Sequence, residues 1–589
     1  MTEQKTKNKR EEREGDGLFQ SRRGPTPEEV AALYDKSRKY KTALDLYDCV
    51  NTNENFYIGK QWEGVQANGL PTPVFNFLKK DVMFVVSSIT SDNLKIQATP
   101  LAASAGTKDL AEPARVLNEE YEAIFERNDI VSLLREFARD AAVRGDGCIY
   151  TYWDPDAETG QDAKGAIVSE IVENTRVHFG NPNDRRVQSQ PWIIVESREI
   201  VRKVKKQARE NGSEDWESIS PDDDNTYLGQ ERRTDDKVTK LFVMWKDENG
   251  EVWGYECTQK AEIRKPWKLG IRRYPIVWLS WDYVADCYHG QAMITGLIPN
   301  QIFVNKLWAM AMISLMTSAY PRVIYDRTRV PKWSNQVGAA IGINGGDVNS
   351  VARNMDPATI SPQISQFIAA AIETTNSNLG VTAAATGEVR PDNTSAIIAL
   401  QRAAATPSEI TKQNLYKCVK DLARIYLEFI AEFYGKRVID METPEGLTQE
   451  LSYAVQAGLL PPDTEIPDEI QLEFDFSIFK KLPMQMKLDV GASSYYSEIA
   501  AMQTLDNLLM QGKIDTVQYL ERMPDGYIPD RRGLISELKK AMEVAQAAQT
   551  GMPTPPTNGE IAVDAGEKEP VQPGFTNLQR KITEGEDVR

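Results

Sequence analysis

Apolar positions in the first quarter of the chain recur every three or four residues, which is the spacing that places them on one face of a helix. Within 129–144, for example, this face contains Ile130, Leu134 and Phe137. The pattern predicts helices over 26–48, 74–88, 110–127 and 129–144.

From Cys148 onward, apolar residues alternate with polar ones, which is typical of strands. Asn249-Gly250 lies between two such apolar runs and predicts a hairpin turn. Strands are predicted over 148–153, 166–179, 192–195, 241–245, 251–255 and 274–279. Residues 207–233 are polar and acidic, and they predict a surface insertion in this β-rich part.

Helical spacing then returns. A long helix is predicted over 291–319, ended by Tyr320-Pro321, and a shorter one over 363–378. A very long helix is predicted over 394–434, with a kink at Pro407. The remaining expectations are β or loop structure over 322–362, a loop over 380–393, a strand over 470–479, and two or three helices over 495–549.

The length of 589 residues exceeds a single core and suggests two or three domains. The fold class indicated is α+β and mainly helical. Residues 1–25 and 550–589 are polar or rich in Pro, Gly and Glu, and they are expected to be disordered.

Net charge and residue usage argue against several functions. A net charge of −17 is unusual for a general nucleic-acid binder. The five cysteines are scattered and only two histidines occur, which favours reduced thiols over zinc sites and disfavours histidine-based catalysis. No nucleotide-binding or hydrolase motif is present in the sequence, so we expect no enzyme, no cofactor and no metal.

Two acidic runs, Asp154-Pro155-Asp156 and 222–224, could bind a divalent cation through oxygen ligands. Neither has the spacing of an EF-hand loop, and solvated loop charges are the favoured interpretation.

The most apolar stretch, 307–320, is shorter than the roughly 20 residues that a membrane span needs. We interpret it as a helix buried between protein surfaces.

Several short sequence motifs occur in an order typical of one family. Tyr57-Ile58-Gly59-Lys60-Gln61-Trp62 is followed by a proline-rich helix start that ends in Asn76. The predicted fourth helix ends in Arg144-Gly145-Asp146-Gly147 before a strand. The helix–loop–helix–loop–helix order over 291–434 comes next. Over about 30–549, this order resembles the portal proteins of tailed double-stranded DNA bacteriophages, the head-to-tail connectors.

The resemblance implies a portal fold that assembles as a ring. Its parts would be the wing (26–289, with the insertion 207–233), a first stem helix (290–321), the clip (322–362), a second stem helix (363–379), the tunnel loop (380–393), a long kinked wing helix with a returning strand (394–480) and the crown helices (481–549). The insertion has no evident place in the family core.

The implied function is that of a homo-oligomeric ring, twelve copies in the virion, at one capsid vertex. It would be assembled in the host bacterial cytoplasm and would form the channel for genome packaging and ejection. The implied partners are further copies of the chain, the major capsid protein and scaffold, the terminase large subunit, the head–tail adaptor protein, and double-stranded DNA, with no membrane.

Candidate site residues follow from this assignment. Those proposed to contact DNA are Arg390 and Asn393 in the tunnel loop, and Lys306, Arg322, Arg327, Arg329 and Lys332 in the stem and clip. Surface or inter-subunit ion pairs are an equally good interpretation of these cations. Those proposed to pack between subunits are Leu307, Trp308, Met312, Leu315 and Met316.

Three alternatives remain: another virion structural protein such as an adaptor or minor capsid protein, a membrane-associated pore suggested by 307–320, and a metal-dependent enzyme using the acidic runs.

Overall fold

A computed structural model describes residues 24–101, 111–159, 163–222, 236–319, 323–354, 363–381, 406–442, 469–490 and 495–523, apart from short gaps at 67, 93, 331, 333, 335–340 and 483, and a few residues between 528 and 538. The chain divides into two compact units, Met1–Tyr496 and Ser497–Arg589.

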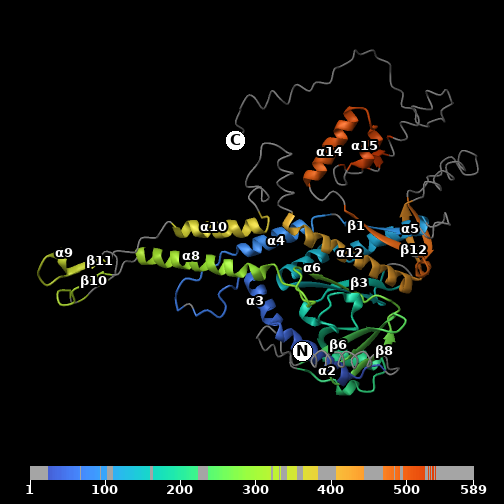
Figure 1. The fold of residues 1–589 in the computed structure, drawn as a ribbon, viewed down its shortest axis with the longest axis horizontal. Helices are drawn as coiled ribbons and strands as arrows, with labels where there is room; N and C mark the ends of the chain where they lie inside the picture. Colours follow the sequence, from blue (N-terminus) through green and yellow to red (C-terminus); the bar gives the residue numbers. More distant parts are fainter. Residues whose placement is uncertain are drawn as a thin grey trace, which may run out of the picture. The chain divides into compact units, whose positions relative to one another are not determined.

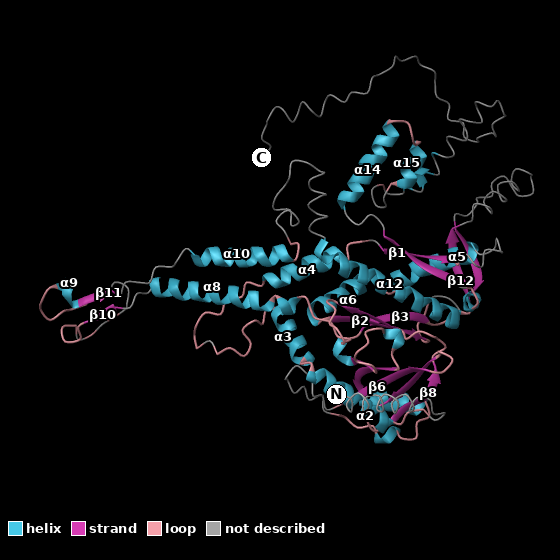
Figure 2. Ribbon diagram, in the orientation of Figure 1, coloured by secondary structure: helices cyan, strands magenta, loops and turns pink. Residues whose placement is uncertain are grey.

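The first part of the chain is helical, as predicted (Figures 1 and 2). Its helices are α2 (Pro27–Ala43), α3 (Leu46–Ile58), α4 (Phe77–Ile89), α5 (Ala111–Arg127) and α6 (Ile130–Arg144). Thr26 caps α2 in a reciprocal capping box with Glu29. The prediction of one helix over 26–48 was wrong, because Asp45 adopts a left-handed backbone (φ 52°) that separates α2 from α3.

Lys41 fastens α2 to the β-rich part. Its ammonium is fully buried and donates hydrogen bonds to three backbone carbonyl oxygens, those of Asn174 (3.0 Å), Thr175 (2.8 Å) and Val177 (2.8 Å). Burial lowers the pKa of Lys41 to about 7. Lys41 lies on the same helix face as Val30 and Tyr34, eleven and seven residues earlier, whereas the exposed Lys36 and Lys39 do not.

Two antiparallel sheets form the β-rich part. One has the order β3-β2-β9, built from Ala166–Ile171, Asp146–Asp154 and Ile276–Ser280. The other has the order β4-β5-β6-β7-β8, built from Val177–Phe179, Trp192–Ile200, Lys237–Lys246, Val252–Cys257 and Glu262–Lys268. The predicted hairpin is confirmed, since β6 and β7 pair around Gly250. The predicted strand over 166–179 is instead two strands in different sheets, separated by a 3₁₀ turn at Asn174–Arg176.

Part of the predicted surface insertion is structural. Helix α7 (Val201–Glu210) buries Val204 and Ala208 in a small core that also contains Ile219. Asp222 then accepts a hydrogen bond from the Arg198 guanidinium at 2.9 Å. Reading 207–233 as surface alone was therefore wrong for its first half, and 223–235 lie outside the described residues.

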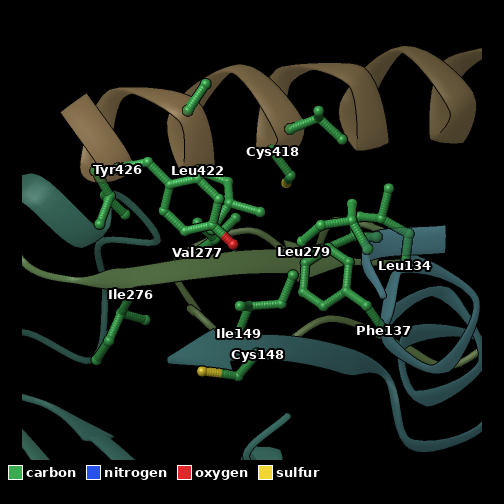
Figure 3. Close-up of a cluster of buried hydrophobic side chains, with 14 of the residues drawn as sticks. Leu134, Phe137, Cys148, Ile149, Ile276, Val277, Leu279, Cys418, Leu422 and Tyr426 are labelled. Atoms are coloured by element: carbon green, nitrogen blue, oxygen red, sulfur yellow. The ribbon is translucent and has the colours of Figure 1, made fainter. Parts of the chain in front are cut away.

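Helix α12 (Glu409–Phe429) lies over the three-stranded sheet, and its buried face meets β9 and α6 in the main core (Figure 3). Figure 3 shows Cys418, Leu422 and Tyr426 of α12 facing Val277 and Leu279 of β9. The helix continues as a π turn over Ile430–Tyr434.

The described part of the long helix predicted over 394–434 begins at a 3₁₀ turn, Thr406–Ser408, which contains Pro407. Residues 394–405 lie outside the described part, so they do not test the upstream half of this prediction.

Downstream, β12 (Lys436–Glu442) pairs with β13 (Glu469–Asp475), and β14 (Met484–Val490) pairs with β1 (Leu94–Pro100). The strand predicted over 470–479 stops at Asp475, because the Asp475 side chain accepts from Ser477 N and caps a 3₁₀ turn over Phe476–Lys480. The second unit contains most of α14 (Tyr495–Met510) and all of α15 (Thr516–Arg522).

Two long helices, α8 (Ile298–Ala319) and α10 (Gln363–Asn378), run side by side (Figure 1). Between them in the sequence, β10 (Val323–Tyr325) pairs with β11 (Ala352–Asn354), which follows the short α9 (Val348–Val351). The bounds of α10 are those predicted. Helix α8 begins at residue 298 and not at 291, because Gln291 is bridged to Asp282 and Ile294–Gly296 forms a 3₁₀ turn.

Candidate functional site

Helix α8 is apolar all round. It has 22 residues and one charged side chain, Lys306, and its most apolar window has a mean hydropathy of 1.3. A helix without a polar face needs apolar surroundings on several sides. By length and composition alone, α8 is also the one helix among the described residues that could cross a membrane.

Within the described part of the structure, the chain covers only the first half of α8. Val304 and Leu307 are buried against Ile368 of α10. Trp308 stacks on Phe75 with ring centroids 4.5 Å apart. Two of the side chains proposed to pack between subunits, Leu307 and Trp308, thus already have partners within the subunit.

Several large apolar side chains in the second half of α8 are left exposed by the described residues. Met310, Leu315 and Met316 are 50%, 62% and 53% exposed, and Met312 is also exposed. Phe367, on the neighbouring α10, is exposed as well. Exposed large apolar side chains gathered on one helix in this way mark a protein–protein or membrane contact.

A buried chain of amides holds the covered half of α8 in place. The Gln301 amide nitrogen donates to the carbonyl oxygen of Phe75 (2.8 Å) and to Asn305 Oδ1 (3.0 Å). The Asn305 amide nitrogen in turn donates to Gln61 Oε1 at 2.6 Å. All three amide side chains are buried. This relay links α8 to the segment between α3 and α4.

The sequence motifs that carry the family resemblance position the segments that pack against α8. Gly59 ends α3 with a left-handed backbone (φ 95°), and Gln61 donates to the Phe56 carbonyl oxygen at 3.1 Å. Asn76 caps α4 and also donates to the Tyr57 carbonyl oxygen at 2.9 Å. These residues bring the end of α3 and the start of α4 together beneath α8.

The motif Arg144-Gly145-Asp146-Gly147 likewise positions the residues that precede α8. Buried Asp146 accepts from Gly290 N at 2.8 Å and lies 2.8 Å from His289 Nδ1. Burial lowers the pKa of His289, although the Asp146 carboxylate opposes this shift. A Cβ on Gly145 would meet the Gly290 carbonyl oxygen at 2.7 Å, so glycine is required for this close approach.

The proposed DNA-contact residues are only partly described. Lys306, Arg327 and Lys332 are exposed, and Arg329 is exposed beside Asp326, with the guanidinium 3.5 Å from the carboxylate. Arg322, Arg390 and Asn393 lie outside the described residues.

The acidic runs do not form a metal site in the described chain. Asp154 accepts a hydrogen bond from Asp156 N at 3.1 Å, which is a local turn. Asp222 accepts from Arg198 and from Thr239 N. No group of three or more His, Cys, Asp or Glu side chains that could hold a metal ion occurs among the described residues.

The sequence predicted the apolar helix and showed the family motifs, but it did not predict the amide relay. Gln61 belongs to one of the motifs quoted above, but nothing in the sequence joins it to Gln301 or Asn305. The one available signal was the pair of amides four residues apart at the start of an apolar helix, since such residues share a helix face.

These features define a packing surface: an apolar helix that the described residues cover over its first half and that buried amides hold in place. The family described as phage P22-like portal protein matches residues 184–456, a little under half of the chain. The match confirms the resemblance to the portal proteins of tailed phages. It spans α8, α10, the described α12 and the insertion at 207–233. The portal protein family is structural and not an enzyme family. The comparison with curated proteins found no match.

Proposed function

We propose that this chain is a portal subunit that closes into a homo-oligomeric ring at one capsid vertex and forms the channel through which the genome enters and leaves. The uncovered apolar half of α8 is the observation that carries the proposal. Burial of one Leu or Met side chain contributes roughly 1.5–3 kcal/mol, so several such residues on one helix favour association.

Cyclic closure suits this surface. In a ring, each subunit offers one patch to the next and a different patch to the previous one, and the contact repeats until the ring closes. The small residues Ala309, Ala311 and Ser314 allow a neighbouring helix to approach α8 closely. Twelve copies would make the ring in the virion.

The parts of the portal fold are assigned accordingly. Helices α8 and α10 are the stem, the β10–β11 segment belongs to the clip, and the body from α2 to β9 is the wing. Residues 380–393 are the tunnel loop, and α14 and α15 belong to the crown. The clip would receive the terminase large subunit and later the head–tail adaptor, and the wing would contact the major capsid protein and scaffold.

The charge of the subunit suits a channel that DNA slides through. Protein–DNA affinity comes largely from Lys and Arg neutralising phosphates, and this chain has a net charge of −17. Local contacts from Lys306, Arg327 and Lys332, and from Arg390 in the tunnel loop, would then guide DNA without holding it.

Native mass spectrometry and negative-stain microscopy of the purified protein test the proposal. We expect closed rings for the wild type and subunits or small aggregates for Leu315→Asp. The matched control is Ile200→Asp, which changes an equally exposed aliphatic residue at the end of β5 and should leave rings intact. Wild-type protein that stays monomeric at high concentration would refute the ring.

The membrane alternative is tested separately, because α8 has the length and composition of a span. A portal ring should stay at the bottom of a liposome flotation gradient. Flotation of the wild type, lost in Leu315→Asp, would favour the membrane-associated pore.

A further inference from the structure

A pocket of about 380 Å³ lies in the first unit, and no residue of α8 lines it. Its walls come from β1, α5, the first turns of α6, and Leu415 of α12. The volume lies in the range of sites that bind ligands or side chains. Its apolar wall consists mainly of Leu94, Ile96, Tyr121, Phe125, Ile130 and Leu134.

The charged groups around this apolar wall are mostly acidic. Asp92, Glu122, Glu126 and Asp129 line the pocket, and Lys95 is the one cation among the lining residues. Lys95 is already paired with Glu122 at 3.1 Å. Asp92 is paired with Lys412 at 2.7 Å, so Glu126 and Asp129 are the lining acids that favour a ligand with positive charge.

Asp92 supplies a specific acceptor. One carboxylate oxygen, Oδ2, accepts from Lys412 Nζ (2.7 Å) and from the Tyr416 hydroxyl. The other, Oδ1, is buried and has no hydrogen-bond partner within the described part of the chain. A buried acceptor without a donor is costly, so a donor brought by a ligand would be favoured there.

The pocket continues onto the surface. Val131 lines it and is 56% exposed at the start of α6. The acid Glu126, at the end of α5, is exposed at the same side. An occupant can thus extend past the rim, which favours a polypeptide segment over a small enclosed molecule.

We propose that this pocket docks a segment of a partner protein in which an apolar side chain is directly followed or preceded by a lysine or arginine. The apolar side chain fills the wall between α5 and α6. The cation meets the acidic rim and donates toward Asp92. No residue of the α8 surface lines this site.

Parallel selection of a random heptapeptide library tests the site. The full-length protein and its Val131→Trp variant, in which the indole covers the pocket, are used as targets. We expect apolar–Lys and apolar–Arg pairs to be enriched at least tenfold on the wild type and not on Val131→Trp. Ile200→Trp, an exposed aliphatic residue elsewhere, is the matched control and should select like the wild type.

Affinity measurements then test the charge. For one selected peptide, fluorescence anisotropy should show binding weakened about tenfold by Glu126→Lys and unchanged by Glu136→Lys, an exposed acid on α6 outside the pocket. Equal enrichment on wild type and Val131→Trp, or enrichment of acidic peptides, would overturn the proposal. So would octylamine binding as tightly as the peptide, because the pocket would then be a site for small amphiphiles.

Discussion

The amide relay beneath α8 makes a quantitative prediction. In Asn305→Ala, Gln61 Oε1 loses the donor that lies 2.6 Å away, and the Gln301 amide loses one of its two acceptors. Each buried polar group left without its partner costs about 1–3 kcal/mol. Because the Gln301 amide keeps its bond to the Phe75 carbonyl, we expect the free energy of unfolding to fall by about 2–4 kcal/mol.

A double-mutant cycle isolates the direct contact. Asn305→Ala and Gln61→Ala remove the two ends of one hydrogen bond, so the double variant should be less destabilised than the sum of the single variants by about 1–2 kcal/mol. Urea unfolding followed by tryptophan fluorescence measures this, at one protein concentration, since assembly links stability to concentration.

The control pair is Gln61→Ala with Asn300→Ala. Asn300 bonds to Thr375 Oγ1 at 3.0 Å and shares no partner with Gln61 in the described chain, so these two effects should add within about 0.5 kcal/mol. Additive behaviour of Gln61 and Asn305 would refute the relay as the anchor of α8.

Three further predictions concern the part of the chain between α2 and β9. Gly145→Ala should lower the free energy of unfolding by about 2 kcal/mol, because φ is +100° and a backbone oxygen would lie 2.7 Å from the new Cβ. The control is Gly296→Ala, which should leave the melting temperature nearly unchanged, because its new Cβ would meet no described neighbour within 4 Å. Burial lowers the pKa of His178 to about 3, so between pH 6.5 and 3 the unfolded chain binds the extra proton and stability falls as pH falls. The free energy of unfolding should therefore fall less between pH 7 and pH 5 in His178→Phe than in the wild type, by about 2 kcal/mol. A urea midpoint that shifts equally in both proteins between pH 7 and pH 5 would contradict this. Asp222→Ala should lower the urea midpoint equally with and without added Mg²⁺, since this carboxylate binds Arg198; a loss seen only with Mg²⁺ would restore the metal interpretation.

Local patterns in the sequence predicted local structure well. The bounds of α10 and the hairpin between β6 and β7 follow from periodicity and from Asn249-Gly250, because both depend on residues that are close in the sequence. No local pattern in the sequence predicted that the helix would be interrupted at Asp45. A residue without glycine's freedom adopts the left-handed region there, which depends on how α2 and α3 pack on the rest of the chain.

Long-range features could not be predicted in this way. The bond between Gln61 and Asn305 joins residues 244 positions apart, and Lys41 meets carbonyls more than 130 positions away. The apolar run of α8 was evident in the sequence, but the division between its covered and uncovered halves depends on where Phe75 and Ile368 lie in the fold.

The pairing of β1 with β14 has a consequence for synthesis of the chain. Leu94 pairs with Val490, so about 390 residues must be made after β1 before its partner strand exists. At about 5–20 residues per second, this takes roughly 20–80 s. One edge of β1 is covered earlier by α5, where Asn118 accepts a hydrogen bond from Ala98 N. The other edge waits unpaired on the ribosome, and open strand edges invite pairing with other chains. A nascent chain that stalls before residue 484 would leave this edge available to other nascent copies on the same message.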